Sequence, residues 1–409
     1  MNLQENLKKY AGLILKVGLN IQPGDNLLLR FSVDGLALAR EIARQAHALG
    51  VHTIYPVFSD DEMTLARFLN APEAAFSEYP AFFVDFTEAA YKDNYHVLNL
   101  SSPNPELLKQ VALGRISAWQ KVTGKASERL MTYTMGNKVK WCVAALPSPA
   151  WAMSVFPGKT EEEAVSALWQ KIFEATRVTE QDPVAAWQRH EAELKRHGDF
   201  LNDQAFQYLL FQAPGTDLTV YLPKGHVWMG GSSTVERGEA FMPNIPTEEI
   251  FSMPHAFKVE GTLAATKPLF TRGRMIEGIR FTFKDGLVVD FDATEGREIL
   301  ADMLDTDEGA RRLGEVALVG DDSPISRTGL LFKNTLFDEN AACHFALGQA
   351  YSECLMGADD MSPEEQQQAG MNKSLIHVDF MVGGPQLDVI GVKEDGSRVH
   401  LLKQGNWVV

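Results

Sequence analysis

The sequence predicts an α/β N-terminal domain with a mainly parallel sheet, followed by an α+β C-terminal domain. Three observations support this fold class. The 409 residues exceed what one hydrophobic core usually supports. Strand-like and helix-like segments alternate through the first half, whereas the second half carries short alternating apolar segments between Gly and Asp turns. We therefore predict domains at residues 1–195 and 196–409.

The first half begins with apolar residues at helical spacing from Asn2 to about Leu19. A Pro-Gly turn then leads into an apolar strand in IQPGDNLLLRFS, and GLALAREIARQAHALG is an amphipathic helix that ends at Gly50. VHTIYPVFSDDE is the next strand. Weaker signals predict strands in FFVDF, YHVLNLSS and WCVAALPS and a helix from Pro105. Strand, helix and strand at this spacing predict parallel pairing through right-handed crossovers.

Two helical segments, TEEEAVSALWQKIFEATRV and DPVAAWQRHEAELKRHGDFLND, close this half and connect the domains. The segments that follow alternate apolar and polar residues, as antiparallel strands do. They are FQYLLFQ, DLTVYLP, FKVEGTLA, IRFTFKDGLVVDFDA and HVDFMVGG. Asp285-Gly286 is a favoured two-residue hairpin turn. SPEEQQQAG is predicted to be an exposed loop.

The composition indicates the cellular compartment and argues against some classes of binding partner. A formal net charge of −16 without a dense basic cluster argues against nucleic-acid binding. The three scattered cysteines argue against a disulfide framework and fit a reducing cytoplasm. The apolar run near the N-terminus is too short for a signal core, and no run approaches the roughly 18 apolar residues of a membrane span. We therefore expect a soluble cytoplasmic protein without a membrane partner.

Two segments of the second half pair histidines with other functional side chains. ENAACHFALGQAYSECLMG is predicted to be a helix, which would put His344 and Tyr351, seven residues apart, on one face. SLIHVDFMVGG is predicted to be a strand, which would direct His377 and Asp379 to the same side of a sheet. Each pair also has a simpler interpretation, as core or surface residues.

Carboxylates in two further segments complete the candidate site. Glu315 lies among apolar residues and glycines in LGEVALVG, so it either faces solvent or meets a cation. Glu248 and Glu249 lie in NIPTEEIFSMPH, where solvated loop charges are the alternative. Carboxylates and imidazoles together suit zinc, manganese or cobalt. The candidate ligands are Glu249, Glu315, His344, His377 and Asp379. Five ligands exceed one tetrahedral site and suit two ions that share a carboxylate, for which Glu315 is the candidate.

The chain resembles the thermophilic-aminopeptidase family of metallopeptidases over nearly its whole length. The motifs that carry the resemblance are, in order, IQPGD, WCVAALPSPAWA, VFPG, NIPTEEIFSMPH, GEVALV, NTLFDENAACHFALGQAY and HVDFMVGG. The resemblance implies a homodimer and an active site in the C-terminal domain. It implies metal ligands at Glu249, Glu315, His344, Tyr351, His377 and Asp379. Glu248 is then left as a candidate general base, and Met253 departs from the small residues common at its position.

The resemblance implies a metal-dependent aminopeptidase that acts on peptides with a free N-terminus. Two divalent ions per subunit, of zinc, cobalt, manganese or magnesium, would activate a water molecule and polarise the scissile carbonyl. Tyr351 would bind the tetrahedral oxyanion or ligate an ion. Two alternatives remain open: another two-metal amide hydrolase, such as a dipeptidase or deacylase, and a metal-stabilised binding protein without enzymatic activity.

Overall fold

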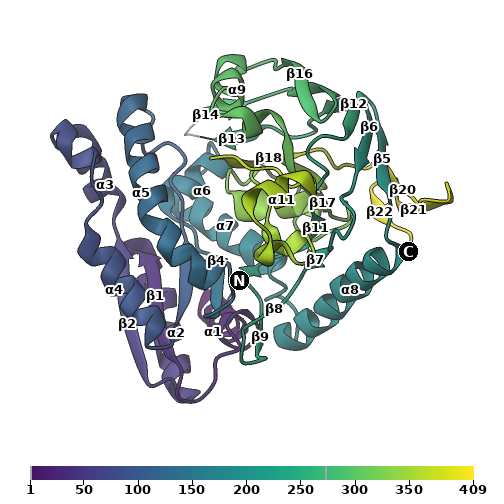
Figure 1. The fold of residues 1–409 in the computed structure, drawn as a ribbon. Helices are drawn as coiled ribbons and strands as arrows, with labels where there is room; N and C mark the ends of the chain where they lie inside the picture. The colour runs from purple at the N-terminus through teal and green to yellow at the C-terminus, as the bar shows by residue number, and fades with distance from the viewer. Residues whose placement is uncertain (1, 272–273) are drawn as a thin grey trace. The chain divides into compact units, whose positions relative to one another are not determined.

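The computed structural model describes residues 2–271 and 274–409 (Figure 1). The chain divides into two compact units. The N-terminal unit contains the residues up to Arg189 together with the segment Ser232–Pro246, and the C-terminal unit contains His190–Gly231 and Thr247–Val409. The chain therefore leaves the N-terminal unit, returns to it for fifteen residues and leaves it again. The domain boundary predicted after residue 195 divides the chain only once and so does not describe the returning segment. This boundary remains a prediction.

The N-terminal unit is built on a five-stranded sheet in the order β10-β4-β3-β1-β2, and every pair is parallel. This result confirms the predicted parallel sheet. The strands are β1 (Asn26–Ser32), β2 (Thr53–Ser59), β3 (Tyr95–Ser101), β4 (Trp141–Ala145) and β10 (Asn244–Ile245). The first four are predicted from the sequence, whereas β10 comes from the returning segment and has no sequence signal of its own.

Helices cover both faces of this sheet (Figure 1). Successive residues Leu27, Leu28 and Leu29 of β1 point to opposite faces and are all buried. Leu28 packs against Tyr91 and Tyr133, which lie on α4 and α5. The helices are α1 (Leu3–Leu13), α2 (Leu36–Ala48), α3 (Asp61–Asn70), α4 (Ala81–Lys92), α5 (Leu113–Thr134), α6 (Pro149–Val155) and α7 (Glu161–Ala175). A π-turn, Ile14–Gly18, extends α1.

Two of the weaker sequence predictions in this unit are wrong. FFVDF belongs to α4 and not to a strand, because its apolar residues serve a helical face: Val84, Thr87 and Tyr91 are buried while Phe82 is 73% exposed. The helix expected from Pro105 begins only at Leu113, since the intervening residues form successive i→i+3 turns.

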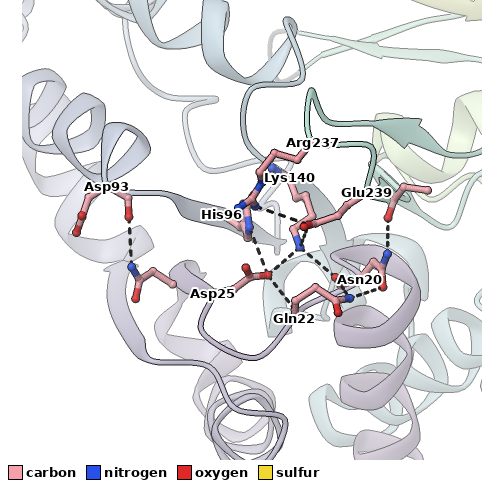
Figure 2. A network of polar contacts seen from close by, with 10 residues as sticks. Asn20, Gln22, Asp25, Asp93, His96, Lys140, Arg237 and Glu239 are labelled. Carbon is pink, nitrogen blue, oxygen red and sulfur yellow. Dashed lines mark hydrogen bonds and ion pairs between the residues drawn. The ribbon is translucent and has the colours of Figure 1, made fainter.

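A buried polar network holds the returning segment in the N-terminal unit (Figure 2). The Lys140 side chain is fully buried, and its Nζ lies 2.7 Å from Asp25 Oδ2 and 2.9 Å from Glu239 Oε2. Nζ also donates to the carbonyl oxygen of Asn20 at 3.0 Å. Burial opposes the charge of Asp25, but hydrogen bonds from His96 and Lys140 outweigh it and lower the pKa of Asp25. Asp25, His96 and Glu239 could hold a metal ion, but the Lys140 ammonium already supplies their cation.

Replacement of Lys140 by Met is expected to lower the free energy of unfolding by about 3–5 kcal/mol, because it leaves two carboxylates facing each other without a cation. The matched control is Lys195→Met. Lys195 pairs with Asp199 at 2.9 Å on an exposed helix face, where loss of the pair costs about 0.5 kcal/mol. Urea denaturation of both variants checks the difference. Equal midpoints would show that the network contributes no stability.

The C-terminal unit contains an eight-stranded antiparallel sheet in the order β16-β15-β12-β6-β5-β20-β21-β22. Its strands are β5 (Tyr208–Ala213), β6 (Thr216–Tyr221), β12 (Val259–Ala264), β15 (Arg280–Lys284), β16 (Leu287–Asp292), β20 (Asp388–Val392), β21 (Arg398–Lys403) and β22 (Asn406–Trp407). The predicted hairpin is confirmed between β15 and β16. Its turn residues Asp285 and Gly286 have φ values of 51° and 73°, as a type I′ turn requires.

A second, five-stranded sheet has the order β19-β18-β17-β11-β7, with antiparallel pairs throughout. Its strands are β7 (Met229–Gly230), β11 (Ile250–Ser252), β17 (Leu313–Leu318), β18 (His344–Gly348) and β19 (His377–Met381). Alternate residues, including Val316, Phe345 and Phe380, enter the same hydrophobic core as Phe211 and Phe281 of the larger sheet. The intervening residues of these strands consequently line the opposite face.

The remaining elements are short apart from α8 (Pro183–Gln204), which contains the division after Arg189. They are the helices α9 (Arg297–Leu304), α10 (Thr335–Asp338) and α11 (Pro363–Gln368) and the strands β8 (Ser233–Thr234), β9 (Ala240–Phe241), β13 (Leu269–Thr271) and β14 (Arg274–Ile276). SPEEQQQAG is exposed as predicted, but it forms α11 and not a loop, because Ser362 and Glu365 make a capping box. No helix among the described residues is long and apolar enough to cross a membrane.

Candidate metal centre

The predicted histidines and acids meet on one face of the five-stranded sheet. Glu315 of β17 pairs with Ala346 of β18, which pairs with Asp379 of β19. Directly paired residues share a face, and so do residues two apart on one strand. His344 precedes Ala346 by two residues and His377 precedes Asp379 by two. The register therefore places all four functional side chains around Ala346.

Glu249 and Tyr351 reach this face from its margins. Glu249 directly precedes β11, whose Ile250 pairs with Leu318 of β17. Tyr351 follows β18, and its ring centroid lies 4.7 Å from that of His377. The structure thus brings together all six residues that resemblance assigns to the metal site.

The predicted helix over ENAACHFALGQAYSECLMG is wrong, although it led to the right convergence. His344–Gly348 is a strand, hydrogen-bonded to β17 and β19 on either side, and Tyr351 arrives through the loop behind it. A strand buried on both faces carries a continuous apolar run that periodicity cannot distinguish from a helix. Gly348 marks the strand's end: its φ is 106°, and a Cβ there would lie 2.0 Å from Ile376 O.

The ligand atoms form two groups of three that share Glu315, with distances within each group of at most 4.8 Å. One group contains Glu249 and His344, and the other contains His377 and Asp379. Glu315 Oε1 lies 3.4 Å from His344 Nε2, whereas Oε2 lies 3.5 Å from His377 Nε2. The two oxygens of one carboxylate therefore face different groups, as a carboxylate that bridges two cations must.

Backbone carbonyls orient both imidazoles. His344 Nδ1 lies 3.1 Å from Ala342 O, and His377 Nδ1 lies 2.7 Å from Gln349 O. With Nδ1 donating to a carbonyl, the neutral ring presents the Nε2 lone pair to the centre. His344 Nε2 is 3.1 Å from Glu249 Oε2, and His377 Nε2 is 3.4 Å from Asp379 Oδ1. Both Nε2 atoms thus point at the carboxylates, as ligand atoms should.

In the metal-free centre, bound protons offset the negative charge of the neighbouring carboxylates. Burial raises the pKa of Glu315, and the charges of Asp379 and Glu249 raise it further. Burial opposes a charge on the histidines, yet Glu249 and Glu315 raise the pKa of His344 well above its ordinary value, and Asp379 raises that of His377 to about 9. The carboxylates of the centre therefore favour positive charge even when protons are its only source.

These residues fit divalent metal ions. Three carboxylates and two imidazoles converge, and the buried Asp379 Oδ1 makes no hydrogen bond beside its 3.4 Å ion-pair contact with His377 Nε2. Burying such groups without a cation is costly. Burial also raises the pKa of Tyr351, and the surrounding carboxylates add to the effect, so its hydroxyl stays protonated unless a cation contacts it directly.

Glu248 belongs to neither ligand group. Its Oε2 lies 3.4 Å from Nε2 of His190 on α8. Its backbone N–H donates to Oδ1 of the buried Asn340 at 2.7 Å, which fixes the loop that carries Glu249. The assignment of Glu248 as general base remains a prediction.

Sequence reasoning missed Asn340 and its neighbour Glu339, which lie in a 3₁₀ turn, Glu339–Ala341, before β18. Glu339 is partly buried. Burial raises the pKa of Glu339 well above its ordinary value, and the charges of Glu249 and Asp379 add to the effect. The sequence signal for these two residues was the FDEN segment, which ends four residues before His344. It went unnoticed because the erroneous helix prediction covered the same region.

Comparison with known proteins agrees with the site. The family model for thermophilic metalloproteases (M29) matches residues 3–407. Aminopeptidase 2 of Geobacillus stearothermophilus is 45% identical over 99% of this chain and 98% of its own, and aminopeptidase AmpS of Bacillus subtilis is 42% identical over 99% of each. The structure of wild-type AmpT from Thermus thermophilus superposes with a TM-score of 0.94 at 40% identity and covers 99% of both chains. The chain therefore belongs to the M29 family of thermophilic metalloproteases, as a metal-dependent aminopeptidase.

Proposed function

We propose that two divalent ions carry the aminopeptidase activity and that Glu315 bridges them. Glu249 and His344 would complete the ligands of one ion, and His377 and Asp379, with Tyr351 beside them, those of the other. The observation that supports this most directly is the orientation of Glu315, whose Oε1 and Oε2 face different histidines. Zinc or cobalt suits the imidazoles better than magnesium does, and manganese is intermediate.

The chain's own side chains have separate roles in the proposed mechanism. The ions, when bound, polarise the scissile carbonyl and lower the pKa of water. Glu315, Glu249 and Asp379 set the charge of the centre, and the two imidazoles, oriented by Ala342 O and Gln349 O, are neutral ligands. The protonated Tyr351 hydroxyl donates a hydrogen bond to the oxyanion of the tetrahedral intermediate. Glu248 is retained as the proposed general base.

The substrates are proposed to be peptides with a free N-terminus. We expect leucine or arginine p-nitroanilide to be hydrolysed at least about a hundredfold faster than its N-acetylated analogue, because acetylation removes the charged amine. Release of p-nitroaniline, followed at 25 °C with metal-loaded protein, measures the ratio. Equal rates on both substrates would point to a deacylase or another amide hydrolase instead.

The assembly and the cellular partners are also proposals. A homodimer is proposed on the family resemblance. A cytoplasmic location is proposed because Cys142, Cys343 and Cys354 are free and buried thiols, as a reducing compartment permits. The net charge of −16 supports a protein that binds neither nucleic acid nor an anionic membrane surface.

A further inference from the structure

We propose that Phe251 and Met229 form the subsite for the side chain of the substrate's N-terminal residue, and that this subsite selects bulky apolar residues. The inference deepens the proposed function, because it rests on the metal centre as the place where the peptide is cut. It concerns an apolar surface beside the ligand residues that the chemistry of the centre does not use.

The sheet register places both side chains on the face that carries the metal ligands. Met229 of β7 pairs with Phe251 of β11. Phe251 in turn pairs with Ala317 of β17, which pairs with His344 of β18. Directly paired residues share a face, so this row leads from the β7 edge of the sheet to a proposed ligand. Ile250, the neighbour of Phe251 on β11, belongs to the hydrophobic core on the opposite face.

A ring contact extends the apolar surface to the second ligand group. The ring centroid of Phe251 lies 6.2 Å from that of Tyr351, and the two planes meet at 70°. Tyr351 in turn lies against His377, with 4.7 Å between the ring centroids. Glu249 precedes Phe251 by two residues. The surface is therefore contiguous with residues of both ligand groups.

Met229, Phe251 and Tyr351 are partly exposed, but they rest on buried side chains. They pack against a small hydrophobic cluster that is distinct from the main core of the unit and consists of Met253, Ala350, Cys354, Leu355, Ala358 and Met371. Apolar area thus remains for a ligand to cover, on a surface supported from behind. Methionine side chains are flexible and fit ligands of different shapes, so we expect the subsite to accept several apolar residues.

The substrate group that best fits this surface is the side chain of the first residue. That side chain branches from the carbon atom bonded to the scissile carbonyl, whereas the amide nitrogen separates the second residue's side chain from the carbonyl. Contact between two apolar surfaces removes both from water and is favourable. A charged side chain would lose hydration there, because Met229, Phe251 and Tyr351 offer it no opposite charge. Phe251 and Met229 are thus specificity-determining residues.

The test compares kcat/KM for metal-loaded protein on amino-acid p-nitroanilides that differ only in the first side chain. We expect Phe251→Ala to lower the leucine-to-alanine ratio by about tenfold, because the larger substrate loses its apolar contacts. Met229→Glu should raise the arginine-to-leucine ratio by about tenfold, because a carboxylate then pairs with the guanidinium. Ratios are used because loss of metal or of folded protein lowers both rates of one variant equally, whereas loss of the subsite does not.

The control variant is Met356→Ala, which shortens a methionine of the same unit that is 65% exposed. It should leave both ratios unchanged. Dipeptides separate the first position from the second: the ratio of alanyl-leucine to alanyl-alanine should be the same for Phe251→Ala and for the unsubstituted protein.

Two results would overturn the proposal. If the dipeptide ratio changes while the p-nitroanilide ratios do not, the surface binds the second residue instead. If no ratio changes in either variant, the surface does not contact the substrate. Failure of the proposed function would look different: the unsubstituted protein would then hydrolyse leucine p-nitroanilide and its N-acetylated analogue at equal rates, whatever the variants do.

Discussion

Replacement of Glu315 by Gln is expected to reduce kcat/KM for leucine p-nitroanilide by about a thousandfold or more. The carboxylate offers one oxygen to each ligand group, whereas an amide presents an NH₂ to one of them. Weakened binding of either ion removes a contribution of several kcal/mol to the transition state, and about 1.4 kcal/mol corresponds to tenfold in rate. Metal content measured beside the rate should fall from two ions per chain.

The folded state should survive this substitution. Glu315 is buried next to two other carboxylates, and its raised pKa shows that the metal-free fold already disfavours its charge. A neutral amide of similar volume is therefore tolerated, and the melting temperature of the metal-free variant should match that of the unsubstituted protein. Glu308→Gln is the control. Undiminished activity of Glu315→Gln in metal-defined buffer would exclude the proposed bridge.

Removal of the metal by a chelator is expected to abolish hydrolysis, and reloading should depend steeply on pH. In the metal-free centre His377 has a pKa of about 9 and that of His344 is also raised, so both rings carry protons at pH 7. Metal ions bind the neutral rings and must displace these protons. The overall affinity for two ions should consequently fall by up to about a hundredfold per pH unit between pH 8 and pH 6.

Calorimetry in buffers of different ionisation enthalpy counts the released protons directly. We expect close to two protons per two ions at pH 7, and about one fewer after His377→Gln. His226 is a suitable control, because burial lowers its pKa and it lies in neither ligand group. His226→Gln should leave the count unchanged. Metal uptake without proton release would show that the histidines are not the ligands.

The parallel sheet and the metal ligands could be predicted from the sequence for different reasons. β1 and β2 carry strong local signals, namely apolar runs bounded by a Pro-Gly turn and by the helix α2, which ends shortly before Gly50. His377 and Asp379 needed only the two-residue period of a strand. The convergence of Glu249, Glu315 and His344 across almost a hundred residues had no local signal and depended on family resemblance.

The errors also have physical causes. The strand that carries His344 is buried on both faces, so it lacks the alternation that marks a half-exposed strand. The same error hid Glu339 and Asn340, which lie in a 3₁₀ turn and not on an α-helix. β10 contributes two residues to the edge of the parallel sheet, and so short a strand leaves no periodicity to detect.

The return of Ser232–Pro246 to the N-terminal unit affects how the protein is made. On the ribosome, the first 189 residues emerge without β10, the second partner strand of β4, and without Glu239, a partner of Lys140 that lies about fifty residues further along the chain. During translation, the N-terminal unit therefore cannot complete its fold until part of the C-terminal unit has also left the ribosome exit tunnel. Likewise, no single cut in the gene separates the units, and a truncation after residue 195 would expose the open edge of a parallel sheet to aggregation.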